Sequence, residues 1–298
     1  MAAKMSVGYS DAYFDYFIPY GVVNKSFSLT LGDGKLLCPV LDLNGEIGGG
    51  RLSLLPVPAV VGEVGKKTIS RLYGDYIDVV SSEAKVITLR VDPIVGIDPD
   101  LLSCFLKDGF DIQNQFTTVI DLNNDLDVLW GRLRTRFKGQ INGFNKLCDI
   151  KVLCRSDQGF EEWIALYSFL TSRGGATPPD AVFDKIRSSV LSGKAALFLA
   201  YQAGTLVAGI YVMFTRGAAY YFSGGVNPDY EKKAAYTHGL FWAAFGFLKS
   251  VGVRYFEVGP IDFPQLGKSV SDKILDISDF KMGLGGRLVP NLILKKEF

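Results

Sequence analysis

The segment from residue 195 to residue 261 constrains the fold of this 298-residue chain more than any other. It opens with three apolar stretches joined by the short turns QAG and TRG, and reads AALFLAYQAGTLVAGIYVMFTRGAAYYFSGGV. A long stretch with helical spacing follows, YEKKAAYTHGLFWAAFGFLKSVG, and then the strand-like RYFEVG. This order predicts an antiparallel meander, one long helix and a further strand, which indicates an α+β fold rather than a doubly wound one.

The rest of the chain adds strands and helices before this segment. Runs of branched and aromatic residues around the turn GDG predict a hairpin within residues 25–43. Further strands are expected at residues 50–62, 85–91, 116–122 and 148–154. Helical spacing and end signals predict helices at residues 66–83, 98–109, 123–147, 157–175 and 178–193. We expect two domains, residues 1–122 and 123–298.

The charge balance argues against a protein that grips nucleic acid along a long track. The chain has 32 Lys and Arg against 31 Asp and Glu, a net charge of +1. Proteins with many phosphate contacts usually carry a basic excess or stripe. The densest basic run here is RLRTRFK, residues 132–138, which suits one helix face. We therefore expect no DNA partner.

Cysteine spacing and hydropathy argue against other classes of protein. The four cysteines form no CxxC pair and are too scattered for a disulfide framework, so no metal site is expected. No run of about 18 uncharged apolar residues occurs, and the first residues lack the apolar core of a signal peptide. A cytoplasmic protein without a membrane-inserted segment is expected.

Five motifs follow one another in the second half of the chain. They are LWGRLRTRFKGQINGFNK, LYSFLTSRGG, LFLAYQAGTLVAGIYVMFTRGAAYYFSGG, GLFWAAFGFLKSVGVRYFEVGP and FKMGLGG. In this order they resemble the FemAB-like group of tandem GNAT acyltransferases. The resemblance covers residues 117–298 and reaches the first half through the order of its elements. It implies two tandem GNAT-like domains, each a mixed, mostly antiparallel sheet flanked by helices, with a cleft between them.

The resemblance also implies the chemistry, with acyl-CoA as a cosubstrate and no permanently bound cofactor. In ordinary GNAT enzymes a tyrosine near the place of Lys281 often protonates the leaving thiolate. Lys281 is therefore expected to stabilise the oxyanion or donate that proton. The alternative is a solvated strand lysine beside a glycine-rich hairpin. The other expected catalytic residues are Glu257, as a base or only as a salt-bridge partner at a strand end, and Tyr221.

The start of the long helix is expected to receive the diphosphate of the donor. The GNAT pyrophosphate motif is absent as written, but KKAAYT, Lys232 to Thr237, stands in its place. Small residues there let helix-start amides approach a phosphate, although paired lysines at a helix start are commonly just solvated. The residues expected to bind the cosubstrate are Lys232, Lys233, Ala235, Thr237, Gly224 and Gly225.

A further group is expected to bind the acceptor. Arg173 offers a planar fork for a diphosphate, or else faces the dipole at its own helix end. Strand alternation predicts Tyr221 and Ser223 on one face and Tyr220 on the other. His238, the single histidine, either faces the cleft or is partly buried and hydrogen-bonded. The expected acceptor-binding residues are Arg173, Tyr220, Ser223, His238 and Asp262.

Three functions remain open from the sequence. The first is transfer of an acyl group from acyl-CoA to the amino group of a nucleotide-linked amino sugar, for cell-envelope polysaccharide. The second is FemX-like aminoacyl transfer from aminoacyl-tRNA to a peptidoglycan precursor, with tRNA as a partner. The third is a binding module without catalysis. The neutral charge balance and the absence of a long charged helical arm favour the first.

Overall fold

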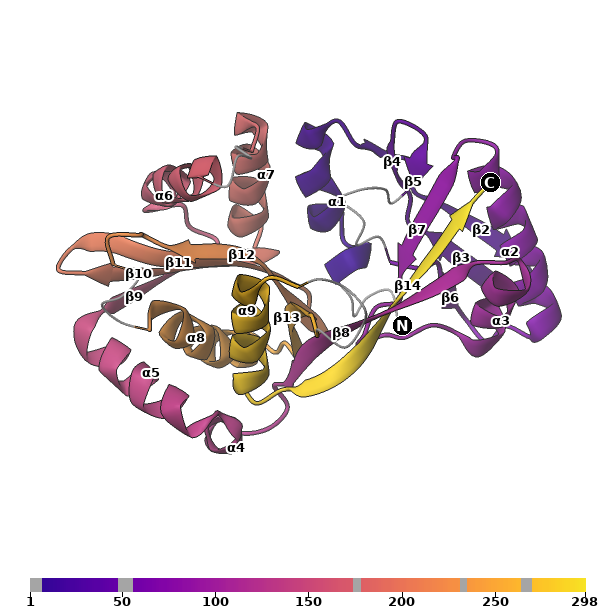
Figure 1. The fold of residues 1–298 in the computed structure, drawn as a ribbon. Helices are drawn as coiled ribbons and strands as arrows, with labels where there is room; N and C mark the ends of the chain where they lie inside the picture. Colours follow the sequence, from indigo (N-terminus) through magenta and orange to yellow (C-terminus); the bar gives the residue numbers. More distant parts are fainter. Residues whose placement is uncertain (1–6, 48–55, 174–177, 231–234, 264–269) are drawn as a thin grey trace. The chain divides into compact units, whose positions relative to one another are not determined.

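The computed structural model describes residues 7–47, 56–173, 178–230, 235–263 and 270–298 (Figure 1). The chain forms two compact units. Unit 1 comprises Met1–Thr117 with Val289–Phe298, and unit 2 comprises Thr118–Leu288. The first change of unit lies close to the boundary expected after residue 122, whereas the C-terminal strand returns to unit 1.

Unit 1 combines helices with strands of two sheets. Its α-helices are α1 (Asp11–Phe17), α2 (Lys66–Ser81) and α3 (Pro99–Lys107), with 3₁₀ turns at Val7–Tyr9 and Ile18–Tyr20. One sheet has the order β2 (Phe27–Leu31), β3 (Gly34–Cys38), β6 (Ala59–Val61). The other strands have the order β1 (Val23–Asn24), β4 (Leu41–Leu43), β5 (Glu46–Ile47), β7 (Val86–Arg90), β14 (Arg287–Glu297).

Local sequence signals account for these elements. The predicted hairpin forms at GDG, with β2 antiparallel to β3. Helix α2 buries the residues that its spacing puts on one face: Ile69, Leu72, Tyr73, Tyr76 and Val80. Helix α3 begins as predicted, because the Asp98 side chain caps the amides of Asp100 and Leu101 and Pro99 occupies the first turn.

Unit 2 is built on the predicted meander. Its helices are α4 (Leu126–Arg132), α5 (Thr135–Leu147), α6 (Phe160–Arg173), α7 (Asp180–Leu191), α8 (Tyr236–Ser250) and α9 (Asp272–Gly283). Its strands have the order β8 (Asp111–Asp121, divided between the units), β13 (Tyr255–Ile261), β12 (Ala218–Val226), β11 (Thr205–Phe214), β10 (Ala195–Gln202), β9 (Asp149–Leu153). Neighbours from β9 to β12 are antiparallel, and β12 is parallel to β13.

Helices cover both faces of the unit 2 sheet (Figure 1). On one face Ile210 and Val212 of β11 join a buried cluster with Phe241 and Phe245 of α8 and residues of α5. On the other face Gly209 of β11 lies so close to α6 that an added Cβ would come within 2.7 Å of Trp163. Alternate residues of each strand therefore enter two separate apolar layers.

A bulge in β12 corrects the predicted alternation. In the register with β11, Ser223 faces Tyr211 and Tyr221 faces Val212, so Phe222 is an extra residue. Tyr211 and Val212 are adjacent and point to opposite faces. Tyr221 and Ser223 therefore lie on opposite faces, and the prediction that they share one face is wrong.

The helix predicted over residues 123–147 is instead two helices. Leu133 and Arg134 between α4 and α5 have extended backbone, with ψ angles of 141° and 135°. Leu133 is buried, and the Arg134 amide donates to the Gly283 carbonyl at 3.0 Å. Burial and this contact with α9 outweigh the helical preference of the run RLRTRF.

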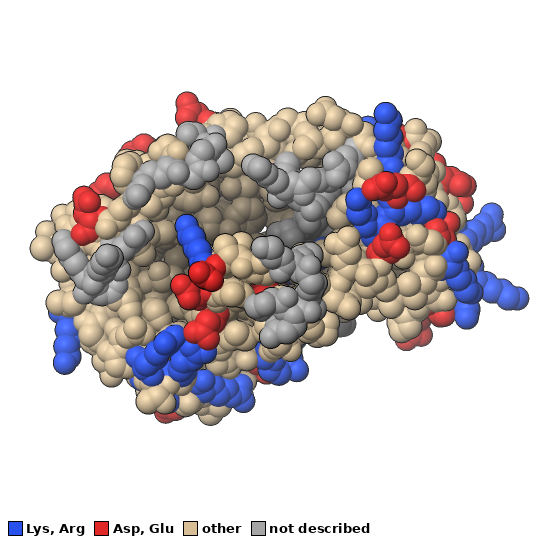
Figure 2. Space-filling model, viewed as in Figure 1, with Lys and Arg blue, Asp and Glu red and all other residues tan. Residues whose placement is uncertain are grey.

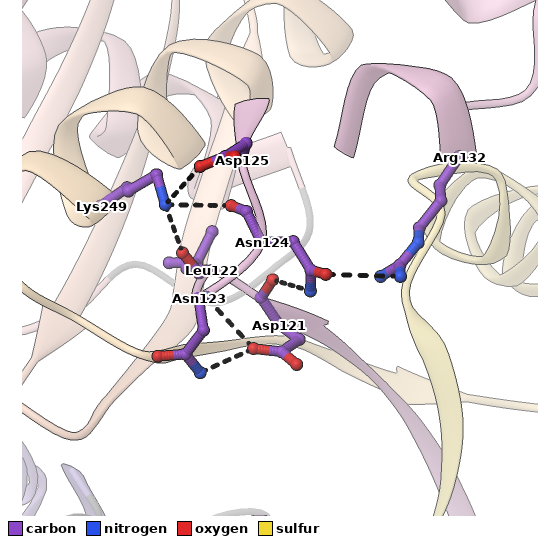
Figure 3. A network of polar contacts seen from close by, with 7 residues as sticks. All are labelled: Asp121, Leu122, Asn123, Asn124, Asp125, Arg132 and Lys249. Atoms are coloured by element: carbon purple, nitrogen blue, oxygen red, sulfur yellow. Dashed lines mark hydrogen bonds and ion pairs between the residues drawn. The ribbon is translucent and has the colours of Figure 1, made fainter. Parts of the chain in front are cut away.

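The C-terminal end of α8 is tied to the loop that follows β8 (Figure 3). The Lys249 ammonium donates to the carbonyls of Leu122 at 3.1 Å and Asn124 at 3.0 Å, with the Asp125 carboxylate 3.9 Å away. Asp121 in turn accepts from Asn123. These contacts fix the far end of the helix whose first turns face the candidate site.

Candidate active site

Strands β12 and β13 part at the centre of unit 2. Their parallel pairing joins Ala218–Tyr220 to Tyr255–Glu257, yet β12 continues to Val226 and β13 to Ile261. Beyond the Tyr220–Glu257 pair, the two strands no longer pair with each other. We call this opening, bounded by β12 residues 221–226 and β13 residues 258–261, the strand opening.

Lys281 lies beside the strand opening. It occupies the last turn of α9, is 8% exposed, and donates from Nζ to the Pro260 carbonyl at 2.9 Å. The alternative of a solvated strand lysine beside a hairpin is therefore wrong, because FKMG continues a helix and the side chain points inward.

Gly259 makes room for the Lys281 ammonium. Its φ of +94° lies in a region that L side chains rarely adopt, and an added Cβ would stand 3.0 Å from Lys281 Nζ. A glycine is needed here on both counts. The dipeptide Gly259–Pro260 thus turns the end of β13 so that one carbonyl meets the lysine.

Burial sets the proton affinity of Lys281. Desolvation lowers its pKa from 10.5 to about 8, although the charges of Asp262 and Glu257 act in the opposite direction. Glu257 is 3% exposed and is the last residue of β13 that pairs with β12. An ammonium with a pKa near that of a thiol is suited to give a proton to a leaving thiolate.

Helix α9 is fixed to its neighbours on two sides. Asp279 accepts two hydrogen bonds from Arg134, at 2.5 and 2.8 Å, and one from Arg136 at 3.0 Å. Toward β13, the Asp262 amide donates to the buried hydroxyl of Ser278 at 3.0 Å. Lys281 follows both anchors within one turn, so its position relative to β13 is defined.

Tyr220 and Tyr221 of β12 point to opposite faces of the sheet where the strand opening begins. The Tyr221 ring packs against Phe241 of α8, 4.9 Å between centroids, and burial raises its pKa. Tyr220 pairs in register with Glu257 and contacts the ring of Phe222. The Ser223 hydroxyl is buried and has no hydrogen-bond partner among the described residues. Their catalytic and binding roles remain predictions.

Packing explains the two glycines of β12. A Cβ on Gly224 would come within 2.7 Å of the Gly209 carbonyl oxygen, and one on Gly225 within 2.4 Å of Leu170. Close contact with β11 and α6 therefore requires small residues here. Donor binding by their backbone remains a prediction.

The predicted diphosphate site is described only in part. Ala235 is the N-cap of α8 and Thr237 lies in its first turn, whereas Lys232 and Lys233 lie outside the described residues. Arg173 ends α6, and its side chain also lies outside the described part of the chain.

His238 is held in an aromatic environment. Its ring meets Phe137 of α5 at 4.2 Å and Phe280 of α9 at 4.8 Å between centroids. Burial, with a contribution from Arg136, lowers its pKa to about 4, so the ring is neutral at pH 7. Its Nδ1 atom is buried without a hydrogen-bond partner among the described residues.

The residues that position Lys281 were not predicted from the sequence. Gly259 and Pro260 carry a signal, because a Gly-Pro pair near the end of a strand marks a turn. In the sequence, Arg134 is one charge of the basic run RLRTRFK. No sequence pattern links it to Asp279, since their pairing depends on how α5 and α9 pack.

Comparison with known proteins identifies the domain that carries this site. Residues 131–265 match the model described as acetyltransferase (GNAT) domain. The chain carries a GNAT-type acetyltransferase domain. No curated protein sequence matches it significantly. The predicted acyltransferase activity is thus confirmed at the level of the enzyme class.

Solved structures show the same fold over nearly the whole chain. A crystal structure of FemX, 12% identical, has a TM-score of 0.71 and covers 98% of this chain and 94% of its own. The C-terminal domain of a putative lysylphosphatidylglycerol synthetase from Agrobacterium fabrum, 13% identical, scores 0.63 and covers 97% and 88%. A tandem GNAT protein from the clavulanic acid biosynthesis pathway, 12% identical, scores 0.56 and covers 97% and 88%. The predicted FemX-like, tandem GNAT fold is confirmed.

Two further observations concern the surface charge and membrane-spanning helices. Figure 2 shows Lys and Arg interspersed with Asp and Glu on the face drawn, without a continuous basic track. Among the described residues, no helix is both long and apolar enough to span a membrane.

Proposed function

We propose that this GNAT-type acyltransferase moves an acyl group from acyl-CoA to the amino group of a nucleotide-linked amino sugar. Lys281, buried beside the strand opening and hydrogen-bonded to Pro260, carries the proposal. A buried lysine amine without a catalytic or binding purpose costs stability, because burial disfavours its charged form.

The donor lies in the strand opening. The backbone amides within residues 223–226 of β12 that point away from β11 polarise the carbonyl of the thioester, and the first turn of α8 receives the diphosphate. Small residues at the helix start, Ala235 and Thr237, permit this approach. The donor thus enters between β12 and β13 with its reactive carbon toward Lys281.

Transfer is direct and needs no acyl-enzyme. The acceptor nitrogen attacks the thioester carbon, a C–N bond forms, and the negative charge gathers on the carbonyl oxygen. The C–S bond then breaks, and protonated Lys281 gives its proton to the departing sulfur. The amine proton passes to Glu257 or to solvent, and solvent reprotonates Lys281.

We infer the class of acceptor from the near-neutral net charge of the chain and from the polar residues near the strand opening. Asp262 and Tyr220 supply hydrogen-bonding groups for a sugar, and the role of Arg173 toward its diphosphate is carried over from the sequence, because that side chain lies outside the described residues. A compact acceptor suits a protein without a basic track. We place the reaction in the cytoplasm, in the synthesis of cell-envelope polysaccharide.

Aminoacyl-tRNA is the second candidate donor. The folds of FemX and of the lysylphosphatidylglycerol synthetase domain favour it, because the FemX-like group transfers amino acids. In that case the bond broken is an ester to ribose and the acceptor is a peptidoglycan precursor. Lys281 has the same role toward the departing ribose oxygen.

One assay separates these candidates. The enzyme is incubated with acetyl-CoA and a panel of uridine and thymidine diphosphate amino sugars, and free thiol and acylated product are both measured. Thiol release that depends on the amino sugar and on Lys281 supports the proposal. No product with any acyl-CoA, together with transfer from aminoacyl-tRNA, establishes the second candidate instead.

A further inference from the structure

Strand β9 is the last strand of the larger sheet at its unit 2 end (Figure 1). It pairs with β10 along one edge, and no strand of the described residues pairs with its other edge. The strand at the opposite end of this sheet, β1, has two residues, whereas β9 has five. An unpaired edge presents a row of backbone N–H and C=O groups that can pair with another strand.

The apolar layer on the α8 side of the sheet is incomplete at this edge. Ile150 and Val152 pair in register with Ala200 and Phe198 of β10, which belong to the buried cluster around α8. Even so, Ile150 is 37% exposed and Val152 is 36% exposed. Leu147, two residues before β9, is 50% exposed. A further strand beside β9 would cover apolar side chains that β10 covers from one side only.

The two charged residues of β9 lie on the other face of the sheet. Asp149 and Lys151 are two positions apart, and alternate residues of a strand share a face. That face is the α6 side, because an added Cβ on Gly159, just before α6, would stand 3.5 Å from Lys151 Nζ. One acidic and one basic residue on the same face of a free edge can specify the register of a partner strand.

We propose that β9 pairs with β9 of a second copy of this chain, in antiparallel direction and with Ile150 at the two-fold axis. Two identical strands related in this way place each residue opposite one that points to the same face. Asp149 then lies opposite the partner's Lys151. On the α8 side Ile150 lies opposite the partner's Ile150, and Val152 lies opposite the partner's Cys148, which has extended backbone directly before the strand.

Charge selects this register over its two neighbours. With Lys151 at the two-fold axis, that lysine lies opposite the partner's Lys151. With Asp149 at the axis, two carboxylates lie opposite each other. Like charges directly opposite in a ladder are destabilising, whereas opposite charges stabilise it. Only the register centred on Ile150 pairs both charges of each strand with their opposites.

The assembly is a closed dimer, because the contact uses the same edge of both copies. One strand pair is a small interface, and small interfaces are typical of weak complexes. We therefore expect a reversible dimer that forms as the protein concentration rises. The inference does not depend on the identity of the acyl donor or of the acceptor.

Disulfide cross-linking of the full chain tests the register. Directly opposite Cα atoms in an antiparallel ladder are about 4.5–5.5 Å apart, a distance that a disulfide bridges. Ile150→Cys is expected to form a covalent dimer under mild oxidation, seen on a non-reducing gel. Lys151→Cys should link at least about tenfold more slowly, because its counterpart lies two positions further along the ladder. Asn145→Cys, exposed on α5, measures linking by random collision.

An exchange of charges tests the same contact without a covalent bond. Lys151→Asp is expected to weaken association at least about threefold in sedimentation equilibrium, because it puts a carboxylate opposite the partner's Asp149. Adding Asp149→Lys to it should restore association, since opposite charges then face each other again. Thermal melting checks that each variant is folded.

Two results overturn the proposal. The first is a rate of cross-linking for Ile150→Cys that does not exceed that of Asn145→Cys or of Lys151→Cys. The second is association that is unchanged by Lys151→Asp, or that the added Asp149→Lys fails to restore in a folded protein.

Discussion

The ammonium of Lys281 and the carbonyl oxygen of Pro260 form a hydrogen bond of 2.9 Å at the end of β13. The bond directs one of the three N–H groups of the lysine toward the backbone. The lysine is thus oriented before any ligand binds, which suits a group that acts on a developing charge.

Replacing Lys281 with methionine is expected to lower kcat by at least about 100-fold, the contribution of a proton donor. It is also expected to raise the melting temperature at pH 7, because the cost of burying a charge disappears. Steady-state kinetics and calorimetry measure the two effects. Lys273→Met, on the exposed side of α9, is the control and should alter neither. Unchanged turnover in the Lys281 variant would remove the lysine from the mechanism.

The stability of the protein is expected to rise with pH in the alkaline range. The pKa of Lys281 in the folded state, about 8, is below its ordinary value of 10.5. The unfolded chain therefore binds more protons between these values, so the cost of burial is complete below pH 8 and absent above 10.5. Denaturant titration should show this rise in the natural protein relative to Lys281→Met. Parallel pH profiles of the two would contradict it.

Turnover is expected to fall as pH rises through about 8, because Lys281 must be protonated to supply the leaving group. The falling limb of the kcat profile measures the pKa of the lysine with substrate bound. Lys281→Arg keeps a charge that does not titrate in this range, so its residual activity should show no such limb. A limb of the same pKa in both proteins would belong to another group.

Gly259→Ala is expected to cost at least about 1 kcal/mol of folding free energy, since its φ is unfavourable for alanine, and to displace Lys281. The kcat of this variant should fall by more than the loss of folded protein explains, because Lys281 is displaced. Gly246→Ala in α8 provides the contrast, because nothing lies within 4 Å of its added Cβ. That change should stabilise the protein by about 0.5–1 kcal/mol. Equal effects of the two substitutions in denaturant titration would refute this account.

Acidification from pH 6.5 to about 4 is expected to lower stability through His238. Its pKa is depressed in the folded state, so the unfolded chain binds the proton first. This is the single histidine, so His238→Gln isolates its contribution. The unfolding free energy of the natural protein, relative to that of His238→Gln, should fall steadily as pH falls through this window. A constant difference between the two would be evidence against a buried neutral ring.

Much of unit 2 could be predicted because its signals are local. The meander, α8 and β13 follow from apolar runs, short turns and helical spacing, which each segment carries in its own residues. The resemblance of FKMGLGG to the terminal motif of the FemAB-like group pointed to Lys281. The position of this lysine on a helix was not predicted. Helix α9 gives a weak pattern because Ile274 and Ile277 are more than 40% exposed and do not mark its buried face.

The features that could not be predicted depend on distant contacts. The bulge at Phe222 changes which side chains share a face, and no single strand records the register of its neighbour. The break at Leu133 and Arg134 arises from burial and from a bond to Gly283. The pairing of Arg134 with Asp279 joins residues on different helices. Each required the packed structure.

The return of β14 to unit 1 affects the order in which the chain can fold during synthesis. Its residues from Val289 onward belong to unit 1, where Ile293 to Glu297 pair with Arg90 to Val86 of β7. The ribosome releases these residues only after all of unit 2, whereas domains generally fold from the N-terminus as they emerge. Unit 2 can therefore complete its part of the sheet before β14 pairs with β7.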